Sequence, residues 1–312
     1  MTYRSPLLQV SGAVAADGLD SGVAAHYGNP VSEQRRLVDG SGWVDLSHRD
    51  VVAVAGPDRL PYLHAMTTQG FADLAPGVTV DALLLSPQGH IEHAFRGVDD
   101  GERFLGHTEA GEGAGLVAFL EAMKFMMRVE ISQVTEDFAV VHQGTSGDLL
   151  LERTELPAYA TTHGPACGVW AREALRIAEG RPRIGLDSDH RTIPNELGLL
   201  GHAVQLDKGC YRGQETVARV HNLGRPPRRL VLLHLDGSVN HLPPHGAAVT
   251  ASDRVVGSVG SSARHHELGP IALALVKRNV PLEATLLADG VPAAQEAVVD
   301  PEIGLHVRPA LR

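Results

Sequence analysis

The sequence predicts an α+β fold whose C-terminal part is an all-β barrel or sandwich. Two observations support this prediction. Stretches with helical spacing of apolar residues alternate with hairpin-like pairs of strands, unlike the single strands of a doubly wound sheet. Beyond residues 225–228, the chain shows only short strand-like runs between turn residues. With 312 residues the chain is also long for one hydrophobic core, so we expect two or three domains.

In the N-terminal two thirds of the chain, apolar runs and turn residues predict individual elements. The run at residues 51–55 is entirely apolar, which is typical of a buried strand. Ser86-Pro87-Gln88-Gly89 separates two strand-like runs and is typical of a hairpin turn. The expected strands are residues 43–47, 51–55, 81–85, 90–95, 128–134 and 138–142. The expected helices are residues 57–66, 116–127 and 170–178.

The helix expected at residues 116–127 has an apolar stripe. The stripe consists of Leu116, Phe119, Leu120, Met123, Met126 and Met127. Methionine commonly fills irregular gaps in a core, so we interpret these side chains as core residues. In the C-terminal part, the expected strands are residues 230–235, 247–250, 255–259, 271–276 and 285–288.

Composition and cysteine usage limit the classes of function. The net charge of −10 argues against a protein that binds nucleic acids in general, DNA included, and against a protein that binds anionic membranes. No apolar run reaches the roughly 18 residues that a membrane-spanning helix needs. The two cysteines, Cys167 and Cys210, are not arranged as C-x-x-C, and so few cysteines in a long chain indicate a reducing compartment. We therefore expect an uncleaved, cytoplasmic protein with no membrane partner.

Cys210 is the candidate functional residue. Gly209 and Gly213 bracket it, and Gln214–Val220 is expected to form the helix that follows. A cysteine just before a helix N-terminus, with Lys208 and Arg212 close in sequence, favours the thiolate form. The alternative is a buried structural cysteine, but the neighbours here are cationic or glycine. A catalytic nucleophile and a thiol ligand of a transferred group both remain open at this point.

Basic residues gather around the same segment. They are Lys208, Arg212, Arg219, His221, Arg225, Arg228 and Arg229. A solvated boundary between domains would explain them, and so would a docking place for an anionic small molecule or a short polyanion. The 17 histidines do not stand at recognised ligand spacings, so we expect no metal site. His265 or His266 is expected to cap a loop.

The segment Lys208-Gly209-Cys210-Tyr211-Arg212-Gly213-Gln214-Glu215, followed by Ala218-Arg219, resembles the K-G-C-Y-x-G-Q-E signature of the YgfZ-type folate-binding proteins. These proteins are relatives of the glycine cleavage T-protein (aminomethyltransferase). Weaker likeness extends from about Trp43 to about Val299. It includes residues 43–47 with 51–58, 175–185 with 193–196, and 257–260 with 271–273.

The resemblance implies a T-protein-like fold of three domains in a ring, with tetrahydrofolate as the bound cofactor. It implies a first folate-binding α+β domain at 42–135, a second at 136–227 that ends in the signature, and a C-terminal β-barrel at 228–312. Residues 1–41 show no clear periodicity, and we expect them to form a surface arm. The folate contacts expected on this basis are Trp170, Arg172, Glu179, Glu196 and Arg219.

The resemblance also implies support of iron–sulfur enzymes, with iron–sulfur client proteins and tRNA-modifying enzymes as candidate partners. T-proteins carry a catalytic aspartate after the first hairpin, where this chain has Glu92-His93. A longer carboxylate beside an imidazole changes the reach to a reacting atom, so glycine cleavage is not expected. Three functions stay open: a folate-binding accessory protein with Cys210 as its thiol, a tetrahydrofolate-dependent one-carbon transferase, and a non-catalytic module that holds a protein or tRNA. Whether the chain is an enzyme is open as well.

Overall fold

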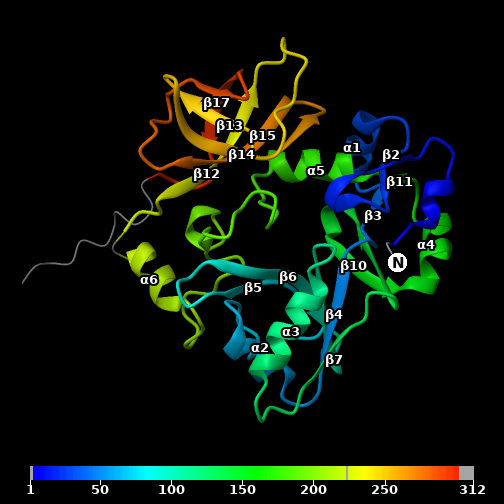
Figure 1. Cartoon of the computed structure of the whole chain (residues 1–312). Coiled ribbons are helices and arrows are strands. Elements are labelled where there is room, and N and C mark those ends of the chain that lie inside the picture. The colour runs from blue at the N-terminus through cyan, green and yellow to red at the C-terminus, as the bar shows by residue number, and fades with distance from the viewer. Residues whose placement is uncertain (1–2, 223, 302–312) are drawn as a thin grey trace, which may run out of the picture. The chain divides into compact units, whose positions relative to one another are not determined.

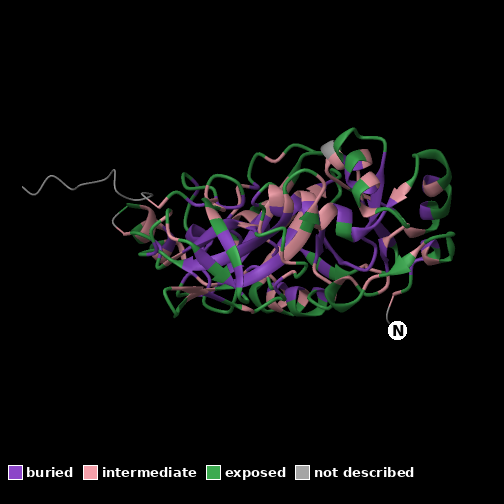
Figure 2. Ribbon diagram, turned by 90° about the horizontal axis from the view of Figure 1, so that it is seen from above, coloured by how far each residue is buried: buried purple, intermediate pink, exposed green. Residues whose placement is uncertain are grey.

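The computed structural model describes residues 3–222 and 224–301 and confirms the α+β prediction (Figure 1). The chain divides into two compact units. The first unit consists of residues 1–65, 70–81 and 95–173, and the second of residues 66–69, 82–94 and 174–312. Buried residues concentrate in the strands of the sheets, and exposed residues in the loops (Figure 2).

The helices are short. They are α1 (Pro30–Val38), α2 (Arg59–Met66), α3 (Gly113–Met123), α4 (Leu156–Thr162), α5 (Val169–Ala178) and α6 (Gln214–Asn222). The strands before the barrel are β1 (Val14–Ala15), β2 (Ala24–His26), β3 (Trp43–Asp45), β4 (Asp50–Ala55), β5 (Thr79–Leu85), β6 (Ile91–Asp99), β7 (Arg103–Thr108), β8 (Glu130–Gln133), β9 (Phe138–His142), β10 (Asp148–Glu152) and β11 (Ala166–Cys167).

Two larger sheets supply most of the first unit, which also contains the two-stranded sheet β1-β2. One has the strand order β5-β6-β7-β4-β8, and its strands β5 and β6 continue into the second unit. The other has the order β10-β9-β3-β11, in which β11 is parallel to β3. Its core is built around Trp43, which is 1% exposed and meets the ring of Tyr159 edge to face at 5.0 Å. Aromatic pairs in this geometry bury a large apolar area and fix the ring orientation.

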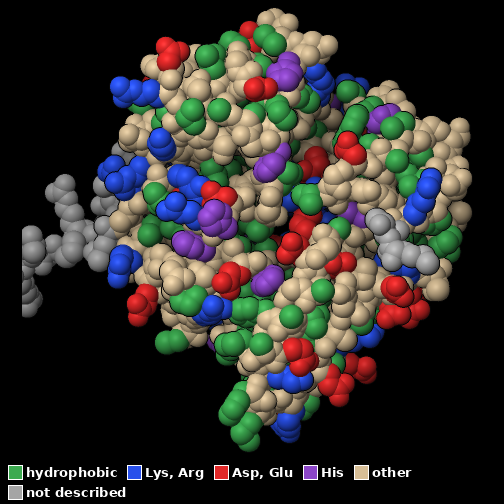
Figure 3. Space-filling model, in the orientation of Figure 1, with side chains coloured by type: hydrophobic (Ala, Val, Ile, Leu, Met, Phe, Trp, Pro, Cys, Tyr) green, Lys and Arg blue, Asp and Glu red, His purple; other side chains and the backbone are tan. Residues whose placement is uncertain are grey.

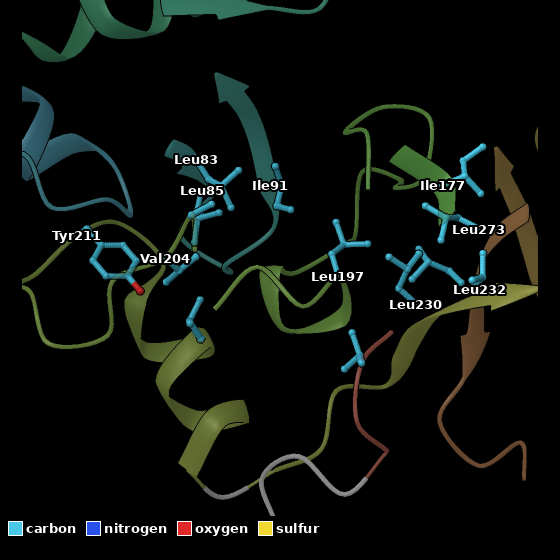
Figure 4. Close-up of a cluster of buried hydrophobic side chains, with 14 of the residues drawn as sticks. Leu83, Leu85, Ile91, Ile177, Leu197, Val204, Tyr211, Leu230, Leu232 and Leu273 are labelled. Atoms are coloured by element: carbon cyan, nitrogen blue, oxygen red, sulfur yellow. The ribbon is translucent and has the colours of Figure 1, made fainter. Parts of the chain in front are cut away.

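A closed barrel confirms the expected C-terminal architecture. Its strands, in the order β12-β15-β14-β13-β16-β17, are β12 (Arg228–Leu235), β13 (Ala248–Ala251), β14 (Arg254–His265), β15 (Gly269–Lys277), β16 (Leu286–Ala288) and β17 (Val291–Ala297). Closure leaves no free sheet edge. A second cluster of the same unit packs the β5–β6 hairpin, through Leu85 and Ile91, with Tyr211 and with Leu230 and Leu273 of the barrel (Figure 4).

Residues 1–41, which are expected to form a surface arm, contain regular structure that the sequence pattern does not predict. Helix α1 lies in this stretch, where the Asn29 side chain caps its N-terminus by accepting from the Ser32 amide. Val23 is fully buried, and the buried Glu33 carboxylate accepts from the amides of Tyr27 and Gly168. Asn29-Pro30 is a favourable helix start, but the buried residues of this helix are Glu33, Gln34 and Leu37, so no apolar stripe marks it in the sequence.

The assignment of the methionine stripe to the core is also wrong. Leu116 and Leu120 are buried, but Met123 is 44% and Met126 82% exposed. Helix α3 ends at Met123, before the expected residue 127, and Phe125 adopts a left-handed backbone with φ 43°. The helical spacing that places the first two leucines inward therefore does not extend to the last methionines.

A buried ion pair fixes the segment after α5 to the barrel within the second unit. The Arg176 guanidinium donates to Asp187 Oδ2 at 2.7 Å and to Ser261 Oγ of β14 at 2.9 Å. Ser261 Oγ donates to Asp187 Oδ1 at 2.7 Å. All three side chains are buried, so each charge and polar atom of this network depends on its partners inside the protein.

Two buried imidazoles share one carboxylate in the first unit. His142 Nδ1 lies 2.7 Å from Asp148 Oδ1, and His107 Nε2 lies 3.2 Å from Asp148 Oδ2. Burial lowers the pKa of both histidines, and the carboxylate only partly opposes this effect. Burial alone would raise the pKa of Asp148, but hydrogen bonds from the two histidines hold it well below its usual range. At pH 7 the two histidines are therefore neutral, and the Asp148 carboxylate between them is ionised.

This arrangement predicts a stability that falls in mild acid. The unfolded histidines take up protons near pH 6.5, while the folded ones do so only at lower pH. Stability present at pH 7 is therefore lost as the pH drops below about 6.5, by up to about 1.4 kcal/mol per pH unit for each such proton. Urea unfolding at pH 7.5 and 5.5 should show this loss, and H142Q should reduce it. H241Q changes an exposed histidine paired with Asp289 and should leave the loss of stability between the two pH values unchanged. If H142Q loses as much stability as wild type between pH 7.5 and 5.5, the buried histidines do not cause the loss.

Candidate functional site

Lys208 anchors the first part of the signature segment. Its ammonium group donates to the carbonyl oxygens of Thr67 at 2.6 Å and Gln69 at 3.0 Å, and it lies 5.3 Å from the ring centre of Tyr211. Burial lowers the pKa of Lys208 to about 8. A lysine that is only 8% exposed and binds two carbonyls holds backbone in place.

Tyr211 and Gly213 anchor the segment on the other side of Cys210. Tyr211 is 8% exposed and belongs to the cluster of Figure 4, and burial raises its pKa to about 12. Gly213 has φ 81°, and a Cβ there would lie 2.5 Å from the Ser86 carbonyl oxygen and 3.0 Å from Gly89 Cα. Only glycine allows this close approach, which packs the start of α6 onto the β5–β6 turn. Gly209, by contrast, has open space around it and no left-handed φ.

Cys210 itself is a free, exposed thiol that directly precedes buried Tyr211. It lies shortly before Gln214, where α6 begins, as the sequence predicts. Cys167 is the opposite case, because it is 1% exposed and burial raises its pKa to about 12. Of the two cysteines, only Cys210 is therefore accessible to a ligand.

The cations close to Cys210 in sequence are engaged with other groups. Lys208 binds the two carbonyls described above, and Arg212 Nη1 pairs with Glu92 Oε2 at 3.1 Å. Glu215 in the first turn of α6 is exposed.

Glu92 stands where the T-protein resemblance places a catalytic aspartate. Its carboxylate is about one third exposed and pairs with Arg212 of the signature segment. The two residues thus link β6 to the segment that carries Cys210. An ion pair of this exposure contributes little to stability, so it can open for a ligand at small cost.

Glu196, an expected folate contact, is fully engaged in structural bonds. It is 1% exposed, accepts from the Ile193 amide, and pairs with Arg228 Nε at 2.8 Å. Arg228 also donates to Asp189 at 2.6 Å. Hydrogen bonding to Glu196 raises the pKa of Arg228, and hydrogen bonding to Arg228 lowers that of Asp189. This carboxylate is not available to a pterin without breaking a partly buried pair.

The other expected folate contacts are distributed over both units. Trp170 is 52% exposed, with its ring tilted against His26 at 5.2 Å, and Arg172 lies 3.6 Å from Glu173; all four residues belong to the first unit. Glu179 and Arg219 belong to the second unit. Glu179 is exposed beside Arg181, 3.0 Å away, and Arg219 is exposed on α6. An exposed indole and an exposed carboxylate are groups that a folate could use.

The basic residues around the signature do not form one free cluster. Lys208, Arg212 and Arg228 have the partners described above, and Arg229 is 2% exposed and donates to the carbonyls of Arg278 and Val280. Arg219 and Arg225 remain exposed. Sequence reasoning overlooked the exposed Arg254, Lys277 and Arg278, which are far from the signature along the chain.

Residues 3–222 and 224–301 contain no group of three or more His, Cys, Asp or Glu side chains that could hold a metal ion. His265 caps a loop as expected, because its Nδ1 accepts from the amides of Glu267 and Leu268. None of the helices in the same described residues is long and apolar enough to cross a membrane.

Comparisons with known proteins agree with this architecture. The family model of the CAF17 C-terminal β-barrel domain matches residues 228–298. The aminomethyltransferase of Geobacillus kaustophilus is 27% identical, over 90% of this chain and 92% of its own length. The tRNA-modifying protein YgfZ of Colwellia psychrerythraea is 25% identical, over 61% of this chain and 71% of its own. A mitochondrial homologue of the iron–sulfur cluster assembly factor IBA57 from Mycosarcoma maydis is 25% identical, over 66% of this chain and 61% of its own length.

Among solved structures, the aminomethyltransferase T of Bartonella henselae superposes with a TM-score of 0.75 at 19% identity, covering 96% of both chains. This likeness confirms the T-protein-like fold. The chain is thus a protein of the aminomethyltransferase fold with a CAF17-type barrel. More particularly, it is a YgfZ-type relative of the aminomethyltransferase (glycine cleavage T-protein) family.

Proposed function

We propose that this protein is a tetrahydrofolate-binding accessory protein that supports the assembly or repair of iron–sulfur enzymes in the cytoplasm. Cys210 is its working thiol. The observation that carries the proposal is the presentation of Cys210: the residue is exposed, while Lys208 before it is buried and hydrogen-bonded and Tyr211 after it is buried in an apolar cluster. A thiol on an anchored segment is preorganised to meet a ligand, and thiolates are preferred ligands of iron–sulfur clusters.

The relatives support the same class of function. One is named for tRNA modification and another for iron–sulfur cluster assembly, and both align with more than half of this chain. Client enzymes that contain iron–sulfur clusters, including tRNA-modifying ones, are the partners proposed here. The metal in this proposal is cargo of the client, not a resident ion of this chain.

Folate binding is proposed from the family likeness together with the side chains that the resemblance implies as folate contacts. Trp170, Arg172, Glu179 and Arg219 stay predicted contacts, whereas Glu196 is held by Arg228 and is assigned a structural role. An indole offers a stacking surface, and arginine pairs well with the carboxylates of a glutamyl tail.

Calorimetric titration with tetrahydrofolate tests the proposal. Wild type and C210A should bind with affinities within about twofold, and W170A should bind at least about tenfold more weakly, equivalent to about 1.4 kcal/mol. F125A removes another exposed aromatic ring of the same unit and serves as the control with unchanged affinity. Absence of binding heat in the wild type would contradict folate binding and favour a pure interaction module.

A tetrahydrofolate-dependent one-carbon transferase is the second candidate, favoured by the aminomethyltransferase relative that matches 90% of the chain. In that case Cys210 would be modified during the reaction. A one-carbon mass increase on the Cys210 peptide after incubation with methylene-tetrahydrofolate would separate this candidate from the accessory protein.

A further inference from the structure

Five exposed cations of the second unit form an uncompensated basic face. They are Arg219, Arg225, Arg254, Lys277 and Arg278. None of them forms an ion pair with an acidic residue among residues 3–222 and 224–301, although the whole chain has a net charge of −10. The basic face therefore contrasts with Arg176, Arg212 and Arg228, which all have carboxylate partners.

Contacts of side chains with backbone carbonyls bring four of the five residues together from distant parts of the chain. Arg278 Nη1 donates to the Arg225 carbonyl at 3.3 Å, and Lys277 Nζ donates to the Val255 carbonyl, next to Arg254, at 3.0 Å. Arg219 lies in the last turn of α6, which leads to Arg225. In Figure 3, Lys and Arg side chains gather at the left edge, beside α6 and the barrel.

The absence of carboxylate partners among the described residues points to an external anion. Side chains of like charge held close together repel one another, and the repulsion is relieved when an anionic surface covers them. Arg219 interacts favourably with the helix dipole, because it lies in the last turn of α6, and Lys277 and Arg278 donate to neutral carbonyl groups that do not cancel their charge. The other four cations have no carboxylate partner in the described residues.

The chemistry of the second unit favours an acidic protein over a nucleic acid as the partner. Tyr211 is the one aromatic residue among phenylalanine, tryptophan and tyrosine in the sequence of this unit, and it is buried. Recognition of single-stranded RNA depends on bases stacked on aromatic rings, which this face lacks. A long polyanion would also extend beyond the face onto a protein of net charge −10, whereas a compact acidic protein surface would not.

We infer that the basic face is the docking surface for a protein partner with a carboxylate-rich surface. The inference rests on the proposed function, because it gives the client of Cys210 a place to bind. Helix α6 links the two: Cys210 lies shortly before its first residue, and Arg219 lies in its last turn. Its nine residues span roughly 13 Å, so a docked protein reaches the thiol without a large movement.

Binding of a fluorescent glutamate-rich peptide, followed by anisotropy at low salt, tests the docking surface with the full-length protein. The double variant R225E/R254E should weaken binding at least tenfold, and neither side chain donates a hydrogen bond within the described residues, so folding should be retained. The matched control R4E/R35E changes two exposed arginines of the first unit by the same charge and should bind as wild type does. Wild-type affinity should fall as salt is raised.

The outcomes separate this inference from the proposed function. Equal affinity in R225E/R254E and wild type would overturn the docking surface, and so would a tenfold preference of this face for transfer RNA over the peptide. C210S should still bind the peptide while losing iron–sulfur support in cells. If C210S keeps that support, the proposed function fails even where the peptide result holds.

Discussion

Replacing Cys210 with alanine is expected to reduce the activity of iron–sulfur enzymes at least tenfold in cells that depend on this protein. The reason is chemical: Cys210 is exposed and Cys167 is buried, so no other accessible thiol can substitute. The folded structure should be unaffected, because an exposed side chain is removed and the anchors Lys208 and Tyr211 remain. Complementation of a deletion strain, scored by the activity of an iron–sulfur enzyme, measures the effect.

C167A is the matched control for this experiment. It removes the other thiol from a closely packed position, where a Cβ on Gly42 would already lie 2.7 Å from its sulfur. The variant should lose about 1–2 kcal/mol of stability but keep iron–sulfur support. Equal loss of support in C167A and C210A would show that protein stability, not the Cys210 thiol, decides the result.

Replacing Arg176 with methionine is expected to cost about 3–5 kcal/mol in the free energy of unfolding. The substitution keeps much of the side-chain volume but leaves the buried Asp187 carboxylate without its guanidinium. The amide of Arg183 and the hydroxyl of Ser261 still donate to Asp187, but neither carries a positive charge. Urea unfolding monitored by circular dichroism measures the loss.

R181M is the control for the ion pair of Arg176. Arg181 also lies 3.0 Å from a carboxylate, that of Glu179, but its side chain is 72% exposed. Exposed pairs contribute between zero and about 1 kcal/mol, so this variant should remain close to wild type. Similar losses in R176M and R181M would show that burial does not set the strength of the Arg176–Asp187 interaction.

Much of the fold was predictable because local sequence and tertiary environment agree over most elements. The barrel strands β12 and β15 contain continuous apolar, buried runs at residues 230–233 and 271–276, and they appear where the sequence predicts them. Strand β17 was missed because its residues, Val-Pro-Ala-Ala-Gln-Glu-Ala, include weak strand formers. Its pairing with β12 and β16, which closes the barrel, supplies what local propensity lacks. Helix α4 was missed for a similar reason, since only Leu156 and Tyr159 are buried there.

The candidate site was predictable only in part, because contacts across the chain decide which charges are free. The sequence indicates an accessible Cys210 before a helix, and the structure has that arrangement. The sequence does not indicate that Arg212 pairs with Glu92, or that Glu196 pairs with Arg228. The basic face depends on strand register and backbone contacts that bring Lys277 and Arg278 next to Arg225 and Arg254. No local pattern encodes such a grouping.

The contrast between the two cysteines also makes the protein a ready-made subject for spectroscopic labelling. At neutral pH a maleimide dye or a nitroxide should attach at Cys210, because the Cys167 thiol is buried and its pKa is raised to about 12. The label would sit on a backbone held by Lys208 and by the packing of Gly213, so its signal would report the approach of a partner with little contribution from loop motion. The unmodified chain thus already carries a single reporter position at the place where its chemistry is proposed to occur.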